Sequence, residues 1–337
     1  MNRTRVLAFG VVCALAVGMG AAAVAAGRSD AGRTGQPTEA TAADLALDVA
    51  TVRAGPHLAF RSTALGPTYG RLAVVPLADP GGPRASTDVE CERAYSTAAA
   101  TLCLSADRGA LTTYRAQVLG PDLAPARRFP LAGIPSRARL DPTGGLAATT
   151  TFVSGHSYAA AGFSTSTTVR AVGAGGPAYG DLENFTIMRD GKPYRSADVN
   201  VWGVTFAGGT HFYATVGTKG RTYLAEGDLA RRTLTTMRQN AECPSLSPDG
   251  TRVAYKFRPQ ESKPVWRLAV LDLAGGAQTI LSETRDVDDQ VEWLDNDRVL
   301  YGMAAEGART DVWVAAADGT GRPRILVPNA WSPSVVR

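Results

Sequence analysis

Three groups of side chains in this sequence could react or bind a ligand: a His-Ser segment, the cysteines and a set of acids. The first segment is Gly155-His156-Ser157-Tyr158-Ala159. A nucleophilic serine on a G-x-S-x-G turn needs a glycine where Ala159 stands and an acid that orients the histidine. Neither is present, so a structural or ligand-contacting loop that carries His156 and Tyr158 is a better interpretation than a hydrolase nucleophile.

Spacing and charge argue against two other classes of site. The 3 histidines lie far apart and no two cysteines have C-x-x-C spacing, so we expect no metal site and no cofactor. Lysine and arginine number 35 against 31 acids, which leaves a net charge of +4. A nucleic-acid-binding protein needs a clustered basic stripe, so we expect no nucleic acid partner.

The N-terminus has the pattern of a targeting segment. Arg3 and Arg5 precede an uncharged apolar run over residues 6–26, and small residues near its end fit an A-x-A-like cleavage site. We expect residues 1–26 to be a secretory signal peptide; the alternative is an uncleaved anchor, since about 20 apolar residues can span a bilayer. Residues 27–55, rich in Gly, Ala and Thr, predict a flexible tether. The protein is then secreted or extracytoplasmic, and only this segment touches a membrane.

Residues 56–337 repeat one pattern. Short β-rich runs are broken by Gly, Pro, Asp and Ser, and one phrase returns about every 40 to 50 residues. Its clearest copy is a strand, the turn Pro248-Asp249-Gly250-Thr251 and a second strand. Proline presets φ in such a turn, and glycine adopts the positive φ that other residues resist. Copies centred on residues 97, 141, 206, 247 and 293 each predict a unit of about four strands.

A single four-stranded sheet cannot bury both of its faces. Repeats of this period bury them by packing radially as propeller blades. Residues 57–87 have the outer strands of a blade, and residues 331–336 supply the missing inner strand. Pairing the two chain ends completes a sixth blade and removes the open edges that invite aggregation. We therefore predict an all-β, six-bladed antiparallel β-propeller, closed by its terminal strands and monomeric.

A family resemblance supports this fold. Residues 244–255 (PSLSPDGTRVAY) resemble the blade motif of the TolB-like β-propellers. Residues 134–137 (IPSR), 155–158 (GHSY) and 287–294 (VDDQVEWL) are similar to phrases of a secreted actinobacterial TolB-like group. In envelope TolB proteins the propeller follows a mixed α/β domain and binds partner proteins. The resemblance therefore implies a propeller with a binding role.

The repeat also places the cysteines. Setting Cys91 on Cys243 puts Cys103 where Tyr255 stands, and the hairpin around the turn places residue 243 opposite residue 255. Cys91 and Cys103 would then face each other closely enough for a disulfide, and export makes oxidation plausible. The alternative is two buried thiols. Cys243, in a blade on the opposite side of the ring, is expected to stay a buried free thiol.

Three acids share one position in the repeat. Glu90, Glu242 and Asp288 each lie where an outer strand crosses to the next inner strand, so they should surround one end of the channel. Converging carboxylates attract cations and amines, which makes them candidate ligand-binding residues together with His156 and Tyr158. The alternative is solvated loop acids that share a register.

The function that these patterns favour is a non-enzymatic binding scaffold. Its partner would be an envelope protein or a cell-wall ligand. The alternative is a hydrolase or lyase with its active site at the end of the channel, because propellers host both kinds of function.

Overall fold

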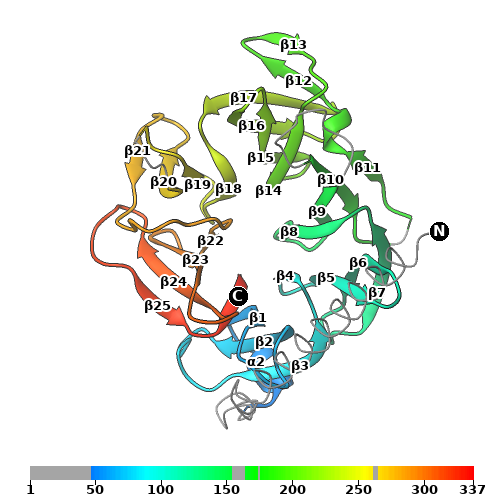
Figure 1. Cartoon of the computed structure of the whole chain (residues 1–337), viewed down its shortest axis with the longest axis vertical. Coiled ribbons are helices and arrows are strands. Elements are labelled where there is room, and N and C mark those ends of the chain that lie inside the picture. Colours follow the sequence, from blue (N-terminus) through cyan, green and yellow to red (C-terminus); the bar gives the residue numbers. More distant parts are fainter. Residues whose placement is uncertain (1–46, 154–163, 174, 261–264) are drawn as a thin grey trace, which may run out of the picture. The chain divides into compact units, whose positions relative to one another are not determined.

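The computed structural model describes residues 47–153, 164–173, 175–260 and 265–337. These residues form six sheets arranged in a ring, with one strand of each sheet closest to the axis (Figure 1). All strand pairs are antiparallel except β12 with β17. The predicted six-bladed β-propeller is therefore confirmed.

The first three blades have four strands each, ordered from the axis outward. Blade 1 consists of β26 (Ala330–Val336), β1 (His57–Ser62), β2 (Arg71–Pro76) and β3 (Ala85–Glu90). Blade 2 consists of β4 (Arg93–Ser96), β5 (Thr101–Arg108), β6 (Thr112–Leu119) and β7 (Pro125–Leu131). Blade 3 consists of β8 (Ile134–Leu140), β9 (Leu146–Val153), β10 (Ser164–Ala171) and β11 (Ala178–Asp181).

The other three blades follow the same order, with an addition to blade 4. Blade 4 consists of β14 (Asn200–Gly208), β15 (His211–Thr218), β16 (Arg221–Asp228), β17 (Thr233–Gln239), and then β12 (Thr186–Arg189) and β13 (Lys192–Tyr194). Blade 5 consists of β18 (Glu242–Leu246), β19 (Arg252–Phe257), β20 (Arg267–Asp272) and β21 (Gln278–Ile280). Blade 6 consists of β22 (Glu292–Trp293), β23 (Arg298–Ala304), β24 (Thr310–Ala316) and β25 (Arg324–Val327).

The ring closes as the sequence predicts. Strand β26 at the C-terminus pairs with β1, and its register sets Val336 opposite His57 and Ser334 opposite Ala59. The Ser334 hydroxyl also accepts a hydrogen bond from the Ser96 backbone N–H of blade 2, at 3.0 Å. The last strand of the chain therefore holds blade 1 together and links it to its neighbour.

The turns inside the blades are built by an aspartate and a threonine. The Asp249 carboxylate accepts hydrogen bonds from the backbone N–H of Thr251 at 3.0 Å and from its hydroxyl at 2.8 Å, while Gly250 has a φ of 72°. The same bond from a threonine recurs at Asp141 and Asp318. A short polar side chain that bonds its own turn is the physical reason why this phrase repeats.

The core of the protein lies between the blades. Six clusters of buried apolar side chains occur in the described residues, and each joins two neighbouring blades. Between blades 6 and 1, for example, Val312 shares a cluster with Leu58 and Phe60. Each blade therefore needs both neighbours to remove its two faces from water.

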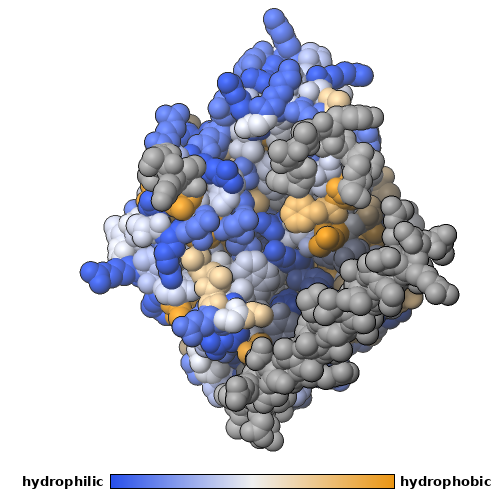
Figure 2. Space-filling view, viewed as in Figure 1, coloured by the Kyte–Doolittle hydropathy of each residue, from blue (hydrophilic) through white to orange (hydrophobic). Residues whose placement is uncertain are grey.

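Blade 4 carries a hairpin that the sequence analysis missed. Strand β12 pairs in parallel with β17, and β13 forms its outer edge. Hydrophilic side chains cover the end of the molecule where β12 and β13 lie (Figures 1 and 2). The dipeptide Asp190-Gly191 at the turn is a known hairpin signal, and it is the clue that would have predicted this element.

Two short helices complete the described structure. Helix α2 (Val49–Arg53) includes the last part of the segment predicted as a tether; it begins at the capping residue Asp48 and buries Val52 against blade 1. The 3-10 helix η2 (Leu182–Asn184) precedes β12. The predicted signal peptide lies outside the described residues. Among the helices that are described, none has the length and apolar character needed to cross a membrane.

The predicted disulfide and free thiol are confirmed, but the predicted position of Cys91 opposite Cys103 on paired strands is wrong. Cys91 and Cys103 form a disulfide with a Cα–Cα distance of 5.4 Å, and Cys243 is a buried free thiol. Cys103 lies in β5 opposite Ala94, whereas Cys91 precedes β4 in the crossover from blade 1. The bridge therefore fixes a crossover onto the second strand of blade 2 and does not join two paired strands.

Deleting β26 tests the ring closure. A chain that ends at Asn329 should lose on the order of 5 kcal/mol of unfolding free energy, because it loses buried side chains and exposes an edge of β1. Thermal unfolding and solubility measure the effect. Deleting only Arg337, which lies beyond β26, is the control. An unchanged melting temperature for the chain ending at Asn329 would show that the closure is wrong.

The cysteine assignment can be tested by a peptide map under non-reducing conditions. The map should link Cys91 to Cys103 and leave Cys243 free. Replacing both bridged cysteines by serine should lower the unfolding free energy by up to about 3 kcal/mol, because the unfolded chain loses a closed loop. The matched control is Cys243→Ser. A bridge that contains Cys243 would contradict the observed arrangement.

Candidate functional site

The crossovers between blades all lie at one end of the ring. Each outer strand connects there to the inner strand of the next blade, as at residues 90–93, 131–134, 239–242 and 281–292. We call this end, defined by those four crossovers, the mouth of the channel. The three acids singled out by the repeat lie in these segments, and their environments differ.

The structure brings together two of the three acids. Glu242 begins β18 and is 7% exposed, and Asp288 lies in the crossover to blade 6 with an exposed side chain. Glu90 ends β3 in blade 1 and is exposed. Among the described residues no contact joins Glu90 to the other two acids, so the acids do not form one continuous ring.

A lysine stands between the two acids that do meet. The Lys256 ammonium lies 3.8 Å from a Glu242 carboxylate oxygen and forms a close ion pair with Asp288. Lys256 itself is 4% exposed, so this pair of contacts is protected from solvent screening. The acidic field expected from sequence is therefore compensated by a cation from the neighbouring strand.

Burial and the lysine shift the two acids in opposite directions. Burial raises the pKa of Glu242, and the Lys256 charge only partly opposes this effect. Although burial also acts on Asp288, the Lys256 ammonium holds the pKa of that carboxyl below its ordinary value. Asp288 is therefore the ionised partner of Lys256 over a wide range of pH.

Two of the sequence candidates cannot be placed. His156 and Tyr158 belong to residues 154–163, between β9 and β10, which lie outside the described residues.

The channel wall is lined by buried ion pairs. Arg139 of β8 forms a close ion pair with Glu292 of β22, and Tyr95 of β4 donates a hydrogen bond to the same carboxylate at 3.2 Å. Burial, followed by the Glu292 charge, raises the pKa of Tyr95 to about 12, so its hydroxyl remains a donor. Three blades are thus joined across the axis by one charged group.

Two further arginines lie closer to the mouth. Arg93 forms an ion pair with Asp289 at 3.6 Å and stacks over Trp331 at 4.8 Å from the ring centroid. Arg137 donates to the Ser136 carbonyl at 2.9 Å and has no carboxylate partner in the described part of the chain. The cavity left between these groups is about 30 Å³, room for one or two water molecules. Between these groups, the side chains leave little free space.

At the mouth, two cations flank a tryptophan. The Lys256 ammonium lies 4.1 Å and the Arg258 guanidinium 4.0 Å from the centroid of the Trp266 ring. The Trp266 backbone N–H donates to Asp286 at 2.6 Å, which fixes the loop that carries the ring. Trp266 is partly exposed and Arg258 is exposed. We call Lys256, Trp266 and Arg258 the mouth platform.

Within the ranges that the structure describes, no group of three or more His, Cys, Asp and Glu side chains could hold a metal ion.

The sequence analysis missed Lys256 although the signal was present. The same hairpin register that places residue 243 opposite 255 also places Glu242 opposite Lys256, and the structure has that pair. Cross-strand neighbours of opposite charge attract each other, so the lysine was predictable as the partner of the acid.

Comparison with known proteins yields matches in structure only. No sequence family and no curated protein matches the chain. TolB from Acinetobacter baumannii superposes with a TM-score of 0.56 at 14% identity, over 84% of this chain and 67% of that one. The present chain therefore has the fold of a TolB-like six-bladed β-propeller.

Two further solved structures superpose on this chain with lower TM-scores. A putative TolB from Agrobacterium tumefaciens has a TM-score of 0.46 at 12% identity, over 81% of this chain and 88% of that one. A puromycin-hydrolyzing peptidase from Mycobacterium tuberculosis has a TM-score of 0.46 at 14% identity, over 77% of this chain and 42% of that one.

Replacing Lys256 by methionine tests the ion-pair network at the mouth. We expect Lys256→Met to lower the unfolding free energy by about 3 kcal/mol at pH 7, because buried Glu242 loses its compensating charge. The folded state then holds a proton on Glu242 more tightly than the unfolded state, whose pKa is about 4.3. Stability falls as pH rises through that window, so the loss should be smaller at pH 5 than at pH 7.

Urea unfolding at the two pH values measures this difference. The matched control is Lys192→Met, which removes an exposed lysine from the β12–β13 hairpin and should change stability little. Equal losses at pH 5 and pH 7 would show that Glu242 is not the group left uncompensated.

Proposed function

We propose that this TolB-like propeller is a non-enzymatic binding scaffold that acts outside the cytoplasmic membrane. Its partner would be an envelope protein or a cell-wall component. The basic residues, apolar run and small residues at the N-terminus support export. The fold supports a binding role, and the mouth platform supplies the specific contact surface.

The single observation that carries this proposal is the mouth platform. Tryptophan and arginine are the residues that most often dominate binding energy at interfaces, and here they lie together at an accessible position. The buried ion pairs of Lys256 hold one side of the tryptophan in place. A surface that is already ordered loses less conformational entropy when a partner binds.

The experiment compares variants in a quantitative pull-down from envelope extract. The double change Trp266→Ala and Arg258→Ala should reduce capture of the specific partner at least about tenfold, as expected for interface residues of this type. Arg231→Ala is the matched control, since this arginine side chain is 83% exposed and lies on a loop at the opposite end of the strands from the mouth. Melting temperatures confirm that each variant is folded.

A second variant asks whether the acids take part. The double change Glu242→Gln and Asp288→Asn should weaken capture as well, because it releases Lys256 and so loosens the mouth platform. Full capture by both folded double variants would contradict a role for the mouth platform and for these acids.

A further inference from the structure

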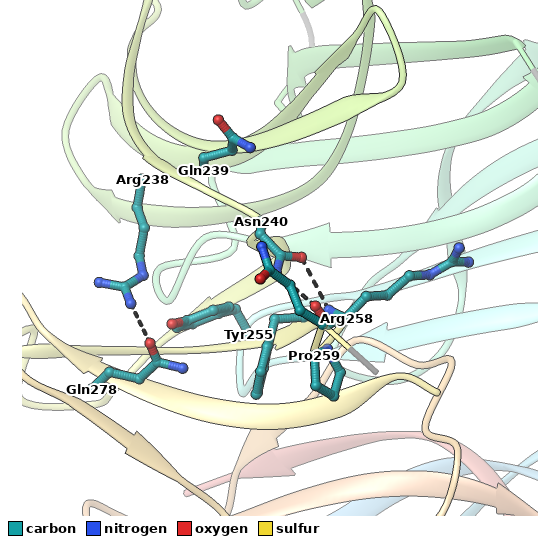
Figure 3. A pocket seen from close by; sticks show the side chains of 9 residues that line it. Arg238, Gln239, Asn240, Tyr255, Arg258, Pro259 and Gln278 are labelled. Carbon is teal, nitrogen blue, oxygen red and sulfur yellow. Dashed lines mark hydrogen bonds between the residues drawn. The ribbon is translucent and has the colours of Figure 1, made fainter. Parts of the chain in front are cut away.

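A second concave site lies between blades 4 and 5, beside the mouth. It is formed by the end of β17, the end of β19 with residues 258–260 after it, and the start of β21 (Figure 3). Its volume is about 260 Å³, close to the lower end of the range for small-ligand pockets. This pocket is therefore much larger than the cavity of about 30 Å³ between the channel arginines.

The polar side chains that line the pocket all carry hydrogen-bond donors. Two arginines, four residues with amide side chains and one tyrosine line it: Arg238, Arg258, Gln239, Asn240, Gln260, Gln278 and Tyr255. Of the residues that the structure describes, no carboxylate lines the pocket. Amides and a phenol both donate and accept hydrogen bonds, which matches the hydroxyl groups of a sugar. The Arg238 guanidinium adds a site for an anion.

Several of these groups are held in position before any ligand arrives. The Asn240 side chain donates to the Arg258 carbonyl at 2.7 Å and accepts from the Arg258 backbone N–H at 3.0 Å. The Arg238 guanidinium donates to the Gln278 amide oxygen and so connects the two blades (Figure 3). Arg238 forms no ion pair with any described acid, so its charge is available to a ligand.

One buried hydroxyl in the pocket lacks a partner. Tyr255 is 1% exposed, and its hydroxyl has no partner within normal hydrogen-bond geometry, although Arg238 lies close enough to oppose the effect of burial on its pKa. Figure 3 shows this hydroxyl turned toward the side of the pocket where Arg238 and Gln278 meet. Burial raises the pKa of Tyr255, so the hydroxyl keeps its proton and can donate. A buried polar atom without a partner costs free energy that a ligand can recover.

The surroundings of the pocket are also basic. The adjoining turn between β15 and β16 carries exposed Lys219 and Arg221, and the Asn240 backbone N–H donates to the Thr222 carbonyl beside them. These cations raise the local concentration of anions without fixing their identity. Phe257 and Pro259 add apolar surface to the lining, against which the carbon face of a sugar ring can pack.

We propose that the pocket between blades 4 and 5 binds an acidic saccharide: a sugar unit whose hydroxyls bond the amides and Tyr255, and whose anionic group binds Arg238. The pocket adjoins the mouth platform: Arg258 belongs to both, and in Figure 3 its guanidinium points away from Arg238, Tyr255 and Gln278. The inference rests on the proposed function only in that the ligand belongs to the cell wall. Variants of the two sites therefore separate the two proposals.

The test measures binding of defined sugars to the purified protein by ligand-observed NMR titration. The probes are glucuronate, glucose 6-phosphate, uncharged glucose and a short glutamate-containing peptide. Glucuronate, glucose 6-phosphate or both should bind at least about tenfold more tightly than glucose, as expected for a charge-assisted bond to arginine. Preference for one of them assigns the anion as carboxylate or phosphate.

Three variants locate the site. Arg238→Gln should reduce the affinity for the acidic sugar to that for glucose, and Tyr255→Phe should weaken it without lowering the melting temperature, since the removed hydroxyl has no partner. Arg231→Gln removes the same charge on an exposed loop and should leave binding intact. Trp266→Ala, which changes the mouth platform and no residue that lines the pocket, should also leave it intact.

Some results would overturn the inference. Acidic sugars that bind no better than glucose would do so, as would an Arg238→Gln variant with unchanged affinity. Equal binding of the glutamate peptide would show that the pocket recognises an anion and not a saccharide.

Discussion

The whole structure depends on the fact that a blade cannot bury its own faces. Each of the six apolar clusters lies between two blades, so every sheet is stable only as a member of a complete ring. The pairing of β26 with β1 is therefore the bond on which the other contacts depend. It brings residues from the two ends of the propeller into one sheet and so makes folding depend on contacts distant in sequence.

The closed ring then creates a polar problem at its axis. Six inner strands converge there, and the side chains that they direct inward cannot all be apolar without sealing the centre as another core. The protein uses charged groups in pairs: Arg139 with Glu292, and Arg93 with Asp289. Removing one member of such a pair leaves an unpaired buried charge, which destabilises the folded state. The two members of each pair therefore depend on each other. The cavity left among these paired side chains is correspondingly small, about 30 Å³.

Much of the fold was predictable because the signals are local and repeated. The Pro-Asp-Gly-Thr turn and its copies place five of the six blades. The outer strands at residues 57–87 need an inner partner, which residues 331–336 provide. The Cys91–Cys103 bridge was predicted from the repeat alignment, although the hairpin of blade 2 sets Cys103 opposite Ala94 and not opposite Cys91. The candidate site was predicted less well. Aligned positions identified Glu242 and Asp288, but the role of an acid depends on its neighbours, and Lys256 lies on another strand. The pocket between blades 4 and 5 needs side chains from three strands, and no single repeat contains that information.

The extra hairpin of blade 4 links the fold to that pocket. An outer strand of a blade presents an open edge, and β12 covers the edge of β17 only from Thr233 to Thr235. The Thr236 hydroxyl donates to the Met188 carbonyl, and there the cover ends. The rest of β17, through Arg238 and Gln239, is left uncovered where the pocket opens. The insertion thus covers the first part of β17 and leaves uncovered the end whose residues line the pocket.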